Sequence, residues 1–143
     1  MIVALTGNIA AGKSSVVALF RQWGAGIVDA DEVVRDLQRP GTEVFQQIVK
    51  RFGKAVLTPA GELDRAAVRR LILEDTRARS DLNAIVHPAV RAQRDALVAA
   101  ARAAGARIIV ADIPLLFEAA DPAEFDAVVL VDAPEAVRLH RLV

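Results

Sequence analysis

The sequence predicts an α/β protein in which helices flank a parallel β-sheet, and three observations indicate this class. Short, almost wholly apolar runs such as Ile2–Leu5 and Asp126–Val131 are typical of parallel strands that are buried on both faces. Amphipathic helical patterns separate these runs along the chain. Hydrophobic residues make up 54% of the 143 residues, which is above the roughly 45–50% of an average protein. A chain of this length predicts one domain with a core of its own.

The first predicted strand, Ile2–Thr6, leads into a glycine-rich loop, Gly7–Ser14, with the sequence GNIAAGKS. This spacing is that of a phosphate-binding loop (P-loop), whose backbone N–H groups surround a polyphosphate. The lysine contacts the outer phosphates and the serine hydroxyl binds Mg²⁺. A helix predicted over Lys13–Trp23 adds its positive N-terminal end to the same site. The predicted nucleotide-binding residues are Gly7, Ala10, Ala11, Gly12, Lys13, Ser14 and Ser15, with Ser14 as the metal ligand.

The P-loop could also be a glycine-rich turn with a surface lysine. The order of strand, loop and helix favours phosphate binding, because each falls where that chemistry needs it. The fold class is therefore a P-loop NTPase: a parallel sheet flanked by helices, with a helical substrate-binding insertion. Trp23 is expected in the core at helical spacing, and Gly24 closes the first helix.

A second strand is predicted over Gly26–Asp31, and two acids stand at its carboxyl end, where ligands bind in open α/β sheets. The pattern from residue 32 to residue 105 is almost wholly helical. Within it a helix is expected to end near His87, because Pro88 disfavours helical geometry in the residue before it, and Pro88 opens the next helix. Several successive helices are more than one crossover connection between two parallel strands needs. Residues 32–105 are therefore predicted to be a helical insertion over the sheet edge.

The buried-strand pattern returns at Arg107–Ile113 and again at Asp126–Val131. The segment Pro114–Glu118 follows the first of these strands. A last helix, with Pro134 in its first turn, is expected after a cap at Asp132 or Ala133. No internal repeat is present.

Composition narrows the function classes. Eighteen basic and eighteen acidic residues balance, so no overall charge recruits nucleic acid or an anionic membrane. The absence of cysteine excludes thiolate metal sites and a cysteine nucleophile. No signal peptide and no apolar run of membrane-spanning length is present, which predicts a soluble cytoplasmic protein without nucleic-acid or membrane partners. The sequence predicts no oligomeric state.

Five segments taken together resemble the dephospho-CoA kinase family along the whole chain. They are the opening IVALTGNIAAGKS, VDAD at Val28–Asp31, LNAIVHP at Leu82–Pro88, IPLLFE at Ile113–Glu118 and VDAPE at Val131–Glu135. Family members usually carry glycine or serine at the positions of Asn8, Ala10 and Ala11, and threonine at that of Ser15. Alanine is small enough to keep the backbone near phosphate, so we expect a changed affinity and not a lost site.

The resemblance implies a single kinase domain over residues 1–143. This domain would transfer the γ-phosphoryl group of ATP, with Mg²⁺, to the ribose 3′-hydroxyl of dephospho-CoA, the last step of coenzyme A synthesis. Residues 32–105 would bind the acceptor. The family continues through an arginine-bearing lid that begins here near residue 134 and would be incomplete. The resemblance therefore implies a C-terminally shortened member. It also implies an unpaired strand edge around Val128–Val131.

The resemblance also implies roles for single residues. Lys13, Asp31 and Arg141 would be catalytic: Lys13 stabilises the departing phosphoryl group, Asp31 orients the acceptor hydroxyl and takes its proton, and Arg141 is the first arginine of the lid. The substrate-binding set is Asp31, His87, Arg91, Leu115 and Glu118.

Several of these residues also have a structural interpretation. Asp31 could cap the helix that begins near Glu32, and His87 could be an ordinary structural histidine. Arg91 lies on a helix with Arg94 and Arg102 and could be solvated charge, and the leucines could be core.

Two further acids have open roles. Asp29 could support Mg²⁺ through water or brace the loop by a hydrogen bond. Asp112 ends an apolar run, as the metal-holding acid of many P-loop proteins does, although the family does not require an acid there.

Two other functions stay open from the sequence. The first is a kinase for another small metabolite or nucleotide, because the P-loop alone does not name the acceptor. The second is a nucleotide-binding module without kinase turnover. This alternative is considered because the lid would be incomplete.

Overall fold

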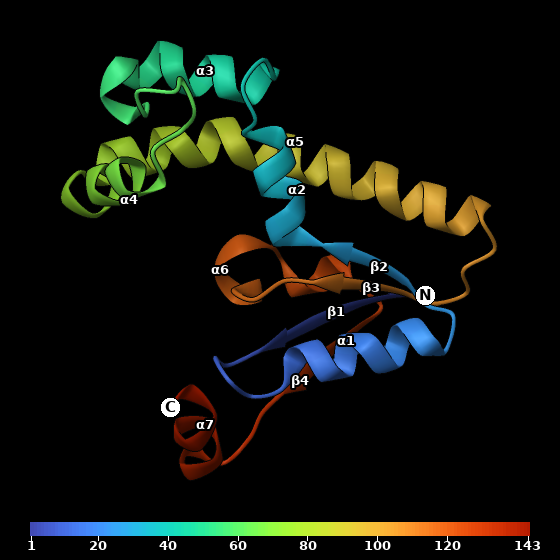
Figure 1. The fold of residues 1–143 in the computed structure, drawn as a ribbon. Coiled ribbons are helices and arrows are strands. Elements are labelled where there is room, and N and C mark those ends of the chain that lie inside the picture. The colour runs from blue at the N-terminus through green and yellow to red at the C-terminus, as the bar shows by residue number, and fades with distance from the viewer. The chain divides into compact units, whose positions relative to one another are not determined.

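Four parallel strands form one sheet in the order β2-β3-β1-β4 in the computed structural model, which describes residues 1–143 (Figure 1). The strands are β1 (Ile2–Gly7), β2 (Gly26–Asp29), β3 (Ile109–Asp112) and β4 (Ala127–Val131). The α-helices are α1 (Lys13–Gln22), α2 (Ala30–Leu37), α3 (Glu43–Phe52), α4 (Arg65–Glu74), α5 (Thr76–Ala103), α6 (Leu116–Ala119) and α7 (Glu135–Leu142), with 3₁₀ turns η1 (Gly53–Val56) and η2 (Pro122–Glu124). The predicted α/β class with a parallel sheet is confirmed.

The chain divides into two compact units. The sheet unit comprises Met1–Asp31 and Arg94–Val143, and the helical unit comprises Glu32–Gln93. The sequence predicted a helical segment as far as residue 105, whereas the division falls inside α5, before Arg94.

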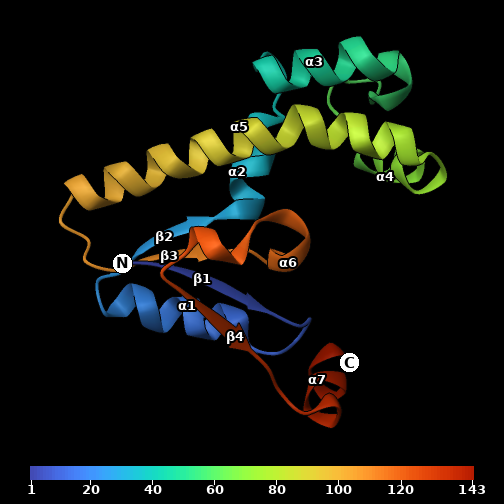
Figure 2. The same cartoon turned by 180° about the vertical axis from the view of Figure 1, so that it is seen from behind.

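Side-chain alternation along the strands gives the sheet two buried faces. On one face Leu5 and Val110 pack with Val17 of α1. On the other, Ala4 and Ala111 pack with Leu116 of α6. Figures 1 and 2 accordingly show α1 and α6 on opposite sides of the sheet. This two-sided cover explains why the strands are near-continuous apolar runs.

β4 is an edge strand, because it pairs with β1 alone. Val128 is 40% exposed and Leu130 is 62% exposed. Figure 2 shows β4 running beside β1 toward α7. The edge expected around Val128–Val131 is therefore confirmed.

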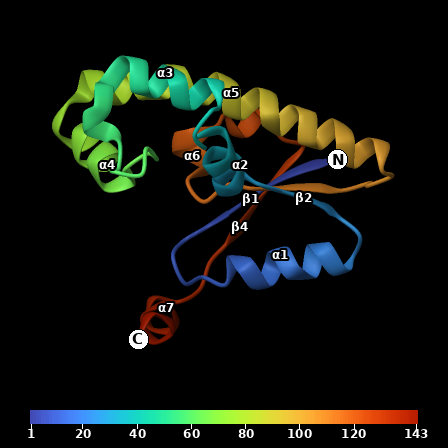
Figure 3. The same cartoon turned by 45° about the horizontal axis from the view of Figure 1, so that its top comes forward.

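The helical unit has a separate apolar core. Val44 and Ile48 of α3, Val56 of η1, and Leu82 and Val86 of α5 form its buried centre. Figure 3 shows α3 and α4 beside the first part of α5. Thr42 caps α3 by accepting a hydrogen bond from the backbone N–H of Phe45, and Asp64 caps α4 in the same way through the N–H groups of Ala66 and Ala67.

The prediction that a helix ends near His87 is wrong. α5 is one helix of 28 residues with Pro88 inside it. A proline removes one helical hydrogen bond, here the one to the carbonyl of Ala84, and its ring crowds that carbonyl. The apolar face formed by Leu82, Val86 and Val90 continues across Pro88 and packs against the helical core, which keeps the helix continuous.

Replacing Pro88 with alanine is expected to stabilise the protein by about 1–3 kcal/mol, because the missing hydrogen bond is restored and the side chain is exposed. The midpoint of chemical denaturation measures this change. Asn83→Ala, also at an exposed position of α5, should gain only about 0.5 kcal/mol from helix propensity. Equal midpoints for Pro88→Ala and the unaltered chain would show that the proline costs nothing here.

The core position predicted for Trp23 is also wrong. Trp23 is 73% exposed and makes an edge-to-face contact with Phe20, with ring centroids 5.8 Å apart. It stands at the C-cap, one residue past the end of α1, where the helical spacing no longer directs a side chain toward the sheet. Gly24 follows with φ of 82°, the left-handed conformation expected of a glycine after a helix.

The last helix begins at Glu135, and Pro134 occupies the cap position without a side-chain hydrogen bond. The predicted cap at Asp132 or Ala133 is therefore wrong, because Pro134 keeps an extended ψ of 144° and delays the helix. No helix of the structure is both long and apolar enough to cross a membrane.

Candidate active site

The P-loop connects β1 to α1 and carries two left-handed residues. Gly12 has φ of 100° and Ala10 has φ of 61°. Ala11 donates its N–H to the carbonyl of Asn8 at 3.1 Å, which closes the loop. The first helical hydrogen bonds of α1 run from Ser15 and Val16 to Gly12. The N–H groups of Lys13 and Ser14 precede these bonds, as is usual in the first turn of a helix, and such groups bind anions.

Gly7 is required by a close approach of two strands. A Cβ atom at Gly7 would lie 2.5 Å from the carbonyl oxygen of Val131, which is its register partner in β4. Thr6, which is 4% exposed, donates its hydroxyl to the carbonyl of Pro114 at 3.0 Å. These contacts fix the point at which the chain leaves the sheet and enters the loop.

Lys13 forms an ion pair with Asp112 through Nζ and Oδ1. The two side chains are 21% and 13% exposed, so the pair is largely sheltered from solvent. Asp112 ends β3 and stands in register with Leu5 of β1 and Asp29 of β2. The strand order therefore brings an acid to the P-loop lysine.

Arg141 contacts the P-loop from α7. Its Nη1 donates to the carbonyl oxygen of Ala10 at 3.0 Å, and the same nitrogen lies 3.4 Å from the position of a Cβ atom on Gly12. Asp132, which precedes α7, accepts a hydrogen bond from Nδ2 of Asn8 at 3.4 Å. Two polar contacts thus connect the end of the chain with the loop, and a second cation lies beside Lys13's loop.

Asp29, and not Asp31, accepts a capping hydrogen bond at the start of α2. α2 begins at Ala30, so Asp31 lies inside the helix and does not cap it. Oδ1 of Asp29 accepts the backbone N–H of Asp31 at 2.8 Å, as a cap does. The exposed side chain of Asp31 projects from the first turn of α2, immediately after the carboxyl end of β2.

The remaining predicted residues are divided between the two units. Leu115 and Glu118 follow β3 in the sheet unit and are exposed, with Leu115 at 61%. His87 and Arg91 are exposed on the part of α5 that belongs to the helical unit. Leu116, between the first two, is fully buried and belongs to the core.

The helical unit contains an open cavity of about 190 Å³. Ile48, Val68 and Ile72 form its apolar wall, and Arg65 and Arg69 also line it. No cluster of three or more histidine, cysteine or acidic side chains suited to a metal is present in the structure.

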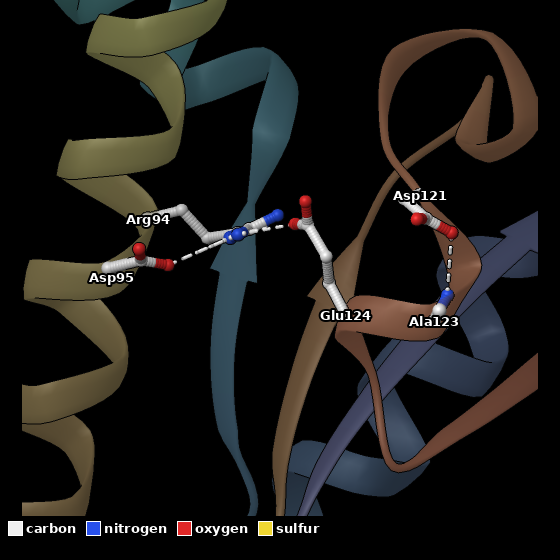
Figure 4. A network of polar contacts seen from close by, with 5 residues as sticks. All are labelled: Arg94, Asp95, Asp121, Ala123 and Glu124. Carbon is white, nitrogen blue, oxygen red and sulfur yellow. Dashed lines mark hydrogen bonds and ion pairs between the residues drawn. The ribbon is translucent and has the colours of Figure 1, made fainter.

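Arg94, named from the sequence only as a neighbour of Arg91 on its helix, is largely buried in a polar network. Its guanidinium donates to Glu124 of η2 at 2.8 Å and to Asp95 at 3.1 Å, and only 16% of the side chain is exposed (Figure 4). Its Cζ atom also lies 5.3 Å from the ring centroid of Phe125. Asp121 supports the same turn by accepting the N–H of Ala123 at 2.9 Å. Arg94 therefore attaches α5 to η2 within the sheet unit.

Sequence reasoning did not find the partners of the loop. Asp112 was considered only as a metal ligand, whereas it pairs with Lys13, and the Asn8–Asp132 contact was not anticipated. The available signal for Asp112 was an acid at the end of a buried strand. Its proximity to Lys13 also requires β3 to lie next to β1 in the sheet, which periodicity alone does not give.

Comparisons with known proteins agree on one family. A family model described as dephospho-CoA kinase matches residues 1–143. Curated dephospho-CoA kinases of Symbiobacterium thermophilum and Moorella thermoacetica are 44% and 46% identical over 99% of this chain. The chain spans 59% of the length of the first relative and 67% of the second.

Solved structures give the same result for the fold. The crystal structure of TT1252 from Thermus thermophilus superposes with a TM-score of 0.81 at 35% identity, covering 99% of this chain and 70% of that one. A dephospho-CoA kinase from Campylobacter jejuni superposes with a TM-score of 0.71 over 90% of this chain and 64% of its own, and at 21% identity this likeness shows the fold. With a family model that matches from the first residue to the last, the chain belongs to the dephospho-CoA kinase family.

Proposed function

We propose that this protein transfers the γ-phosphoryl group of ATP to the ribose 3′-hydroxyl of dephospho-CoA, giving coenzyme A and ADP. The observation that carries the proposal is the match to the family over all 143 residues. The P-loop geometry supports it, because Lys13, the start of α1 and Arg141 gather positive charge around one loop. Phosphoryl transfer depends mainly on such positioning and charge stabilisation.

The P-loop is the proposed nucleotide site. Backbone N–H groups from Gly7 to Ser15 bind the phosphates, and Lys13 stabilises the charge of the group in transfer. Mg²⁺ usually binds few protein ligands, together with substrate phosphates and water. The exposed Ser14 hydroxyl in the first turn of α1 suits that role without a larger acidic cluster. When bound, the ion neutralises phosphate charge.

Asp31 is the proposed acceptor-orienting group. Its carboxylate is exposed, and the hydrogen bond from its N–H to Asp29 fixes its backbone. In a loose transition state the acceptor proton can leave late, so a carboxylate of ordinary basicity suffices if it holds the hydroxyl in line.

The other proposed contacts follow from the family match. Arg141 would stabilise phosphate charge beside the loop, and its hydrogen bond to Ala10 supports this role. Leu115, Glu118, His87 and Arg91 would contact the acceptor, and all four have exposed side chains.

The test is an ADP-release assay of the full chain with MgATP, with and without dephospho-CoA. We expect turnover that depends on dephospho-CoA and that falls by about 10²–10³-fold in Lys13→Ala, the loss typical of removing one preorganised charge from a transition state. Circular dichroism of the variant checks that it is folded.

Two other outcomes would decide against the proposal. Turnover with a different small metabolite, and none with dephospho-CoA, would assign another acceptor. Binding of ATP without any turnover would make the chain a nucleotide-binding module.

A further inference from the structure

The ammonium group of Lys13, which a bound polyphosphate would contact, is already paired with the carboxylate of Asp112. The ammonium of a P-loop lysine contacts the outer phosphates of a bound nucleotide. Here that ammonium contacts a carboxylate, and both side chains are at least three-quarters buried. A sheltered charge of this kind is screened much less by salt than a surface charge. A phosphate that contacts Lys13 therefore competes with Asp112 for the same ammonium group.

Asp112 is held in place more firmly than Lys13. β3 is an inner strand, and Val110, Ala111 and Ile113 around Asp112 are 0%, 1% and 5% exposed. Lysine, in contrast, carries its charge on a flexible stem of four carbons. When a phosphate binds, the side chain that can move is Lys13.

We infer that Asp112 is the resting counter-ion of Lys13 and that it lowers the affinity of the P-loop for phosphate chains not neutralised by a cation. This inference rests on the proposed phosphate-binding role of the loop. Lys13 exchanges its carboxylate partner for phosphate, and the attraction between Lys13 and Asp112 that is lost in the exchange opposes it. Asp112 is thus a positioning residue that acts through Lys13, and it determines how strongly the loop binds free polyphosphate.

The test is calorimetric binding of inorganic tripolyphosphate to the full chain in EDTA. Asp112→Asn keeps the size of the side chain and an oxygen acceptor but removes its charge. We expect about tenfold tighter binding, because Lys13 no longer has to leave a charged partner before it contacts phosphate. Asp36→Asn is the matched control: it removes the charge of an exposed acid that pairs with Arg39 in the helical unit, and its affinity should change less than about twofold because exposed charges are screened.

A double-variant cycle separates action through Lys13 from general repulsion. In the Lys13→Ala background, Asp112→Asn should change the affinity by less than about threefold. An equal gain in both backgrounds, or weaker binding by Asp112→Asn, would overturn the inference. Asp112→Ser removes the same charge with less volume if Asp112→Asn does not fold.

The unaltered chain gives an independent measurement. The ¹⁵N resonance of the Lys13 ammonium, assigned by its absence in Lys13→Ala, should shift when tripolyphosphate saturates the loop. An unchanged resonance at saturation would contradict the exchange of partners. Equal tripolyphosphate affinity of the unaltered chain and Lys13→Ala would instead contradict the phosphate role of Lys13, so the two failures are distinguishable.

Discussion

Asp31→Asn is expected to lower kcat for phosphoryl transfer to dephospho-CoA by about 10²–10⁴-fold, the usual contribution of a positioned general base. Asparagine has nearly the same shape and can still accept a hydrogen bond, but it cannot take the acceptor proton. The affinity for ATP should remain within about twofold, because under the proposed function the charge removed contacts the acceptor and not ATP. Steady-state kinetics with both substrates and a separate ATP titration measure these quantities.

Asp36→Asn provides the comparison within the same helix. Asp36 also lies on α2, and its side chain is 50% exposed. It has no proposed contact with substrate, so its kcat should stay close to that of the unaltered chain. A fall of less than about fivefold in Asp31→Asn would be too small for a general base and would leave Asp31 a binding or structural role.

Ile48→Ala is expected to destabilise the helical unit by about 2–5 kcal/mol, the cost of truncating a large buried aliphatic side chain. Ile48 is 1% exposed at the centre of that core and lines its cavity. If this unit binds the acceptor, the KM for dephospho-CoA should rise while ATP binding to the sheet unit changes little. Denaturation curves and both binding measurements test the prediction.

Leu73→Ala is the control for this substitution. Leu73 lies on α4 of the same unit and is 76% exposed, so its removal should change stability by less than about 0.5 kcal/mol. Equal losses of ATP and acceptor binding in Ile48→Ala would contradict a division of substrate binding between the units.

Local signals predicted the elements well where one principle dominated. Gly12 and Gly24 occupy left-handed positions that only glycine adopts readily, and both were predicted at loop and helix ends. The near-continuous apolar runs predicted strands covered on two faces, as β1 and β3 are. These features depend on a few neighbouring residues, so they can be predicted from the local sequence pattern.

Predictions failed where tertiary packing opposed a local preference. Pro88 disfavours a helix, yet the apolar face on both sides of it packs into one core. The ion pair of Arg94 with Glu124 was not predicted, because the two residues lie thirty positions apart in the chain. The proximity of Asp112 to Lys13 likewise depends on strand order, which is a property of the whole sheet. Such contacts are set by topology and not by spacing along the chain.

The register of the sheet also limits the order in which contacts can form while the chain is being synthesised. β1 pairs only with strands made much later, since Ile2 lies opposite Ile109 and Gly7 lies opposite Val131. The helical unit, by contrast, is one continuous segment, Glu32–Gln93, whose contacts are closer in sequence. Local contacts form faster than distant ones. A growing chain can therefore form the contacts of the helical unit before the strands that pair with β1 have been made. The P-loop gains its contacts with Asp112 and Arg141 only after those distant residues have been synthesised.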